Sequence, residues 1–211
     1  MGSSLCCPEY SHRVATETYE VVPRRSCKIP YKLTYGEKHV VRRHWEQTVL
    51  AQEPNLFLKT MLNSIKDSPR LLDIISCKFF HPKMENIADW PKLKRMANGN
   101  CAFFTKQIVV NHLDEKLVRQ DSERLGTIHI QYAPYGFKTT FLDIWQLNMI
   151  KLIDERIVFP KESEKLHFIS AFKKLISFLC TLMVMEYEDS MQLIRHTERE
   201  YKKVEFCAEM V

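Results

Sequence analysis

Apolar residues recur at helical spacing from His39 into the carboxyl-terminal third of the chain, and strand-like alternation is nowhere sustained. Prolines and glycines divide this pattern into successive blocks, with an irregular region over residues 77–91. We expect helices over residues 39–52, 55–66, 92–112, 114–130 and 138–159, a short helical turn after Ser68-Pro69, and a last helix from residue 163. The pattern therefore predicts an all-α fold.

The chain length of 211 residues suits one domain with additional segments at its ends. Residues 1–38 carry three of the nine prolines and lack a sustained helical period, which predicts an extended, flexible amino-terminal leader. Residues 39–190 contain the helical blocks and form the predicted domain. Residues 191–211 are expected to be a helical extension or tail.

Composition narrows the classes of function. The net charge of +5 is spread along the chain without a nucleic-acid-binding motif, so we expect no nucleic-acid partner. The longest apolar stretch, residues 175–185, is too short to cross a membrane and predicts a buried core helix. Seven cysteines without metal-ligand spacing favour free thiols, and no paired carboxylates, nucleophile–base set or phosphate loop indicates catalysis.

One segment carries a family resemblance. Leu125-Gly126-Thr127-Ile128-His129 resembles the proximal segment of globins, especially the divergent nematode type, in which a leucine one turn before the histidine covers the haem. Tyr135-Gly136-Phe137 and Phe141-Leu142-Asp143-Ile144-Trp145 follow it in the family's order. The resemblance extends over residues 39–190 through Ser68-Pro69 at a short third helix, Asn111-His112-Leu113-Asp114 at a helix end, and Ala171-Phe172-Lys173-Lys174-Leu175 in the last helix.

The resemblance implies a globin-like fold of about seven to eight helices with haem as its cofactor. His129 would then bind the iron from the proximal side, and Leu125, Tyr135, Phe137 and Phe141 would line the slot for the porphyrin. The chemistry agrees, since haem iron needs a neutral imidazole nitrogen and the porphyrin needs an apolar crevice.

The distal side departs from the family pattern. Asn100 lies 29 positions before His129, the separation of the family's distal residue, and Phe104 follows one turn later. Asn98-Gly99 gives an alternative register, because a glycine often follows the distal residue. Ile75 stands where the family has a haem-wedging phenylalanine, with Phe79 and Phe80 nearby as substitutes, and His81 is the candidate for a second axial histidine.

The amino terminus resembles an acylation signal. Gly2 would be exposed for myristoylation by removal of Met1, and Cys6 and Cys7 could be palmitoylated. Because stable anchoring takes two acyl signals, this combination predicts a chain tethered to the cytoplasmic face of a membrane.

Together these features predict a membrane-tethered, haem-binding globin that binds oxygen or another diatomic gas ligand or acts in redox signalling. The alternative is a globin-fold interaction or sensor module without haem, since a fold does not guarantee its usual function. Enzymatic turnover by the haem is a third expectation.

Overall fold

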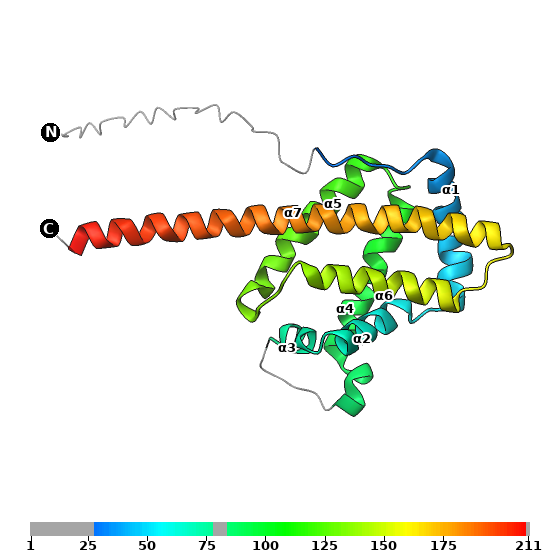
Figure 1. Cartoon of the computed structure of the whole chain (residues 1–211), viewed down its shortest axis with the longest axis horizontal. Helices are drawn as coiled ribbons and strands as arrows, with labels where there is room; N and C mark the ends of the chain where they lie inside the picture. The colour runs from blue at the N-terminus through cyan, green and yellow to red at the C-terminus, as the bar shows by residue number, and fades with distance from the viewer. Residues whose placement is uncertain (1–27, 78–83, 210–211) are drawn as a thin grey trace, which may run out of the picture.

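The computed structural model describes residues 28–77 and 84–209, and in this part of the chain it contains helices and no strands. The all-α prediction is confirmed. The helical elements in chain order are α1 (Tyr35–His44), η2 (Trp45–Leu50), α2 (Leu56–Asp67), α3 (Arg70–Ser76), η3 (Met84–Asp89), α4 (Pro91–Thr105), η4 (Lys106–Val110), α5 (Glu115–His129), η5 (Ile130–Tyr135), α6 (Thr140–Arg156) and α7 (Glu162–Glu209) (Figure 1).

Side-chain caps fix where two of the helices, α1 and α5, begin. Thr34 accepts a hydrogen bond from the Glu37 backbone N–H at 3.3 Å, and the Glu37 carboxylate accepts one from the Thr34 N–H at 2.9 Å. This capping box starts α1 at Tyr35, before the predicted start at residue 39. Asp114 caps α5 by accepting from the Leu117 N–H at 3.0 Å. The caps therefore set the beginning of the helix that carries His129.

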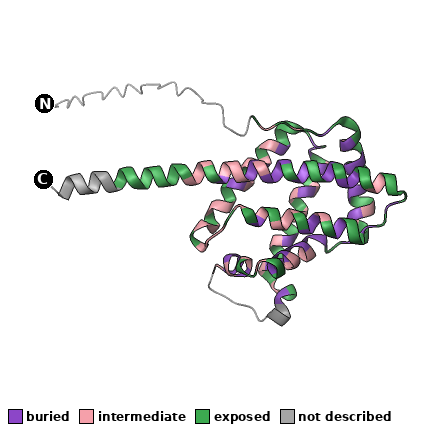
Figure 2. Cartoon of the chain, viewed as in Figure 1, coloured by how far each residue is buried: buried purple, intermediate pink, exposed green. Residues whose placement is uncertain are grey.

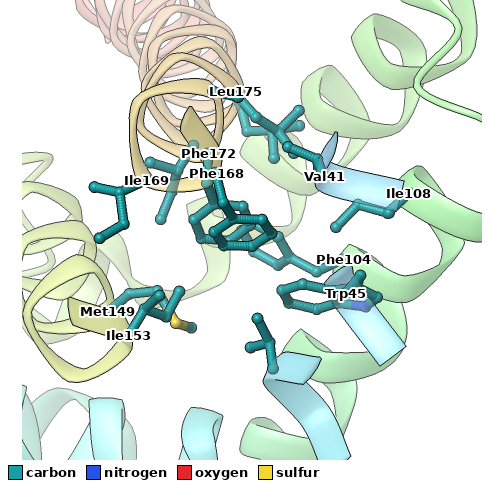
Figure 3. Close-up of a cluster of buried hydrophobic side chains, with 14 of the residues drawn as sticks. Val41, Trp45, Phe104, Ile108, Met149, Ile153, Phe168, Ile169, Phe172 and Leu175 are labelled. Carbon is teal, nitrogen blue, oxygen red and sulfur yellow. The ribbon is translucent and has the colours of Figure 1, made fainter. Parts of the chain in front are cut away.

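A cluster of stacked aromatic rings forms the centre of the core (Figure 3). Trp45 of η2 stacks on Phe172 of α7, with ring centroids 5.5 Å apart, and Phe172 stacks on Phe168 at the same separation. Phe104 of α4 lies 5.9 Å from Phe172. Each large side chain buried here stabilises the fold by about 1.5–3 kcal/mol, so this cluster joins η2, α4 and α7 into one body.

Helix α7 is both the central core helix and a projection. Leu175, Leu179 and Leu182 are buried, so the prediction of a core helix over residues 175–185 is confirmed. The stretch Glu162–Tyr201 is long and apolar enough to span a membrane by length and composition, but most of its apolar window is buried inside the chain. Beyond Met191 the helix leaves the body and its described side chains are exposed (Figure 2).

The segment before α1 packs against the domain. Leu33 is buried in the core, the Tyr31 hydroxyl donates to the Leu113 carbonyl at 3.0 Å, and Arg119 donates to the Ile29 carbonyl at 2.9 Å. The predicted boundary at residue 38 is therefore too late for residues 29–38. Residues that face inward at every second position are typical of an extended chain. They show no helical period, so helical spacing does not predict that this segment packs on the domain.

Replacing Tyr31 with phenylalanine is expected to lower the free energy of unfolding by about 1–2 kcal/mol, because the partly buried Leu113 carbonyl loses its donor. Leu113 and its neighbour His112 have positive φ angles of 57° and 50°, so this corner depends on its surroundings to hold it. Urea unfolding measures the effect. Tyr35→Phe is the control, since Tyr35 is 88% exposed and should change stability by less than about 0.5 kcal/mol. Equal effects of the two substitutions would contradict this role for Tyr31.

Candidate functional site

One mostly apolar cavity brings together most of the predicted site residues. Its enclosed space amounts to about 120 Å³. Cavities lined mainly by apolar side chains with a few polar groups are typical of sites for small molecules. Helices α2 and α4 pack together on one wall, and α5 and α7 pack together on another. Of the predicted residues, the lining includes Ile75, Asn100, Phe104, Leu125, His129, Phe137 and Phe141.

His129 is the last residue of α5 and faces the cavity. Its Nδ1 lies 2.8 Å from the carbonyl oxygen of Leu125, one turn earlier in the helix. A carbonyl can only accept, so Nδ1 carries a proton, and in the neutral ring Nε2 then keeps its lone pair. Among the described residues Nε2 has no hydrogen-bond partner. The helix therefore presents a neutral, oriented imidazole, which is the form that binds a metal.

Burial lowers the pKa of His129, because the apolar surroundings disfavour the imidazolium, while the bond to the Leu125 carbonyl acts weakly in the opposite direction. The ring lies 5.2 Å from the ring of Phe137 and 6.1 Å from that of Tyr132, measured between centroids. The aromatic neighbours and the lowered pKa both keep the imidazole neutral at pH 7.

Close packing of α5 on α7 fixes the position of His129. A Cβ atom on Gly126 would lie 2.6 Å from the Met183 carbonyl oxygen and 2.9 Å from the Glu186 Cβ. Only glycine permits this approach without a shift of one of the two helices. The glycine in the Leu125–His129 segment is therefore explained by a helix contact one turn before the histidine.

The wall formed by α2 and α4 carries Asn100. Its side-chain amide donates to the Met61 sulfur at 3.9 Å, and Phe104 lies one turn further along α4. Asn98 is exposed and does not line the cavity. Of the two registers left open by the sequence, the one with Asn100 is therefore the one that faces the cavity.

One predicted lining residue lies outside the cavity. Tyr135 is not among the described residues that line the cavity, whereas Tyr132 is. Tyr132 follows His129 by one helical turn, so the two side chains share a face, whereas Tyr135 ends the turn of η5 before Gly136 at φ 89°. Helical spacing from His129 places Tyr132 on the same face as the histidine, whereas the resemblance to globins implied Tyr135 as the lining residue. Phe79, Phe80, His81, Gly2, Cys6 and Cys7 lie outside the described residues.

The donor set of the cavity bears on which metal centre it could hold. No group of three or more His, Cys, Asp or Glu side chains that could bind a metal ion occurs among the described residues. A metal beside His129 would therefore need most of its ligands from a cofactor. Four porphyrin nitrogens and one imidazole meet that requirement, and the apolar lining suits a porphyrin.

No family model matches the chain, and the search of curated proteins finds no match. The order of the helices, with short α3 after Pro69, is compatible with a globin-like fold. Conclusions about function therefore depend on the geometry of the cavity itself.

The free energy of unfolding of the haem-free chain is expected to fall as the pH drops from 7 to 5. His129 and His44 both have pKa values lowered by burial, so folding favours their neutral forms. A lowered histidine pKa gives stability that is present above the ordinary value near 6.5 and is lost at lower pH. His129→Leu should reduce the slope by up to about 1.4 kcal/mol per pH unit, measured by urea unfolding across this range. Exposed His196, changed to glutamine, is the control, and an unaltered slope in His129→Leu would contradict the argument.

Proposed function

We propose that this chain is a haem-binding globin in which Nε2 of His129 binds the iron from the proximal side. The observation that carries the proposal is a half-buried, neutral histidine that faces an apolar cavity and whose Nε2 has no partner among the described residues. The bond from Nδ1 to the Leu125 carbonyl supports it, because metal-binding histidines usually donate their other ring N–H to an oxygen. Haem bound there supplies an iron site for a diatomic ligand and for one-electron redox change.

The lining residues fit a flat aromatic group. Leu125, Phe137 and Phe141 come from the side of the cavity that holds His129, and Phe103 and Phe104 come from α4. These side chains would pack on the porphyrin faces and exclude water from the iron. Asn100 would stand on the distal side, because α4 and α5 belong to different walls.

The haem-free module is the alternative, and the position of Phe104 bears on it. Filling of the site by Phe104 would have supported that alternative. Phe104 is only 4% exposed and its ring packs on Trp45, Phe57 and Phe172, toward the core. An enclosed space of about 120 Å³ remains between His129 and Phe104. We therefore prefer a cofactor-binding role, with gas binding or redox signalling as its use.

Titration of the purified full-length chain with haemin tests the proposal. We expect a Soret band that saturates at one haem per chain, together with quenching of tryptophan fluorescence, since Trp145 lines the cavity. Haemin that binds inside the cavity should compete with any bulky side chain placed there. Leu125→Trp puts such a ring in the cavity and should therefore weaken haemin binding. Exposed Leu147→Trp is the matched control. Absence of a saturable band, with haemin binding no tighter than to an unrelated protein, would overturn the proposal.

We also propose that Gly2, Cys6 and Cys7 are acylated and tether the chain to the cytoplasmic face of a membrane. A tethered globin suits signalling or redox chemistry at the membrane better than transport of oxygen over distance. Expressed in cells with labelled myristate, the wild-type chain should incorporate the label and Gly2→Ala should not. Cys6→Ser with Cys7→Ser should keep the label but leave the membrane fraction, because one myristoyl chain binds only marginally. Equal labelling of the wild type and Gly2→Ala would contradict the tether.

A further inference from the structure

The cavity beside His129 has the size and the lining of a site for one aromatic ring. Its enclosed space is about 120 Å³. An apolar cavity of about 150 Å³ holds one benzene molecule, so this space suits a single ring with few substituents. Phe137, Phe141 and Trp145 line it and offer the ring faces and edges on which aromatic molecules pack. The chain without haem therefore has the space and the contacts for a small aromatic molecule.

The same cavity holds polar atoms that lack a partner among the described residues. Nε2 of His129 has none, because the ring uses only Nδ1, on the Leu125 carbonyl. The indole N–H of Trp145 is buried and unpaired. Asn100 uses one amide N–H on the Met61 sulfur, at 3.9 Å, and keeps the other. Since an unpaired polar group costs free energy when it is buried, an occupant with complementary polar atoms is favoured over a hydrocarbon.

These free atoms determine which polar group the occupant needs. Nε2 of His129 is an acceptor in the neutral ring, so the occupant must donate to it. The N–H groups of Trp145 and Asn100 need an acceptor instead. A hydroxyl both donates and accepts, and it is uncharged, whereas an ammonium or a carboxylate would bring a charge into an apolar lining. A hydroxyl on an aromatic ring therefore matches the cavity.

We propose that the haem-free chain binds a small phenol in this cavity, with the phenol hydroxyl donating to Nε2 of His129. The rings of His129 and Phe137 lie 5.2 Å apart and those of Phe137 and Phe141 lie 6.1 Å apart, measured between centroids. The acceptor thus adjoins the aromatic wall on which the phenol ring would pack. This inference goes beyond the proposed haem function and does not rest on it, because it concerns the chain before haem binds.

Calorimetric titration of the purified, haem-free, full-length chain with phenol and with toluene tests the inference. Toluene is similar in size to phenol but has no hydroxyl. The wild type should bind one phenol per chain. In His129→Leu the affinity for phenol should fall by at least about fivefold, the effect of losing one ordinary hydrogen bond, while toluene should bind at least as tightly as to the wild type. His196→Leu, at an exposed histidine, is the matched control and should bind both compounds like the wild type.

Two further measurements do not depend on His129→Leu. Leu125→Trp fills the cavity and should weaken the binding of both compounds. In the wild type labelled with nitrogen-15 histidine, phenol should shift the Nε2 resonance of His129 and toluene should shift it much less. Absence of saturable phenol binding to the wild type would overturn the inference, as would an Nε2 resonance that phenol at saturation leaves in place. Haemin binding is measured separately, so failure of the haem function leaves the phenol result unaffected.

Discussion

Replacing His129 with alanine is expected to weaken haem binding by at least about 100-fold, because the iron loses its protein ligand and loss of a supporting hydrogen bond alone costs 10–100-fold. The apolar walls remain, so residual binding should give a spectrum without the proximal imidazole. Adding free imidazole should restore part of the affinity and the wild-type spectrum, since the substitution leaves space beside Leu125. The measurement is a haemin titration followed by absorption, with and without imidazole.

His196→Ala is the matched control, because His196 lies on the exposed part of α7 and should leave haem binding unchanged. Retention of full haem affinity and an unaltered spectrum in His129→Ala would show that another group binds the iron. The rescue by imidazole separates loss of a ligand from loss of folding, which an added small molecule would not repair.

Gly126→Ala is expected to lower the free energy of unfolding by about 2–3 kcal/mol, although alanine favours helices over glycine. The new Cβ would lie 2.6 Å from the Met183 backbone oxygen, so α5 and α7 must separate. Gly99→Ala makes the same chemical change within α4, where nothing lies within 4 Å of the new Cβ. This control should raise stability by up to about 1 kcal/mol.

Urea unfolding of both glycine variants gives the comparison, and haemin titration gives a second measure. Movement of α5 in Gly126→Ala should also displace His129 and weaken haem binding, while Gly99→Ala should bind haem normally. Stabilisation of the chain by both substitutions would contradict the close contact between α5 and α7.

The helices could be predicted from the sequence because each buries one apolar face, and burial at every third or fourth position leaves a strong period. The cavity residues on the side of His129 also follow one another closely, from Leu125 to Phe141, and so form one pattern in the sequence. Helical spacing does not predict the packing of the extended segment around Ile29, Tyr31 and Leu33. This segment packs through contacts with residues distant in the sequence, such as Leu113.

The α2 and α4 wall of the cavity was harder to predict because its members meet only in the folded chain. Met61 is separated from Asn100 by 39 positions, and its apolar character fits an ordinary core residue of α2 equally well. The choice between Asn98 and Asn100 likewise depends on which face α4 turns inward. Helical period alone does not supply that rotation; packing of α4 on α2 does.

Resonance Raman spectroscopy of the ferrous, haem-loaded chain tests the central claim most directly, since Soret excitation reports the iron–histidine stretching vibration. We expect this band in the wild type, with a shift when histidine is labelled with nitrogen-15, and its disappearance in His129→Ala. Persistence of the same isotope-sensitive band in His129→Ala would contradict the assignment of His129 as the proximal ligand.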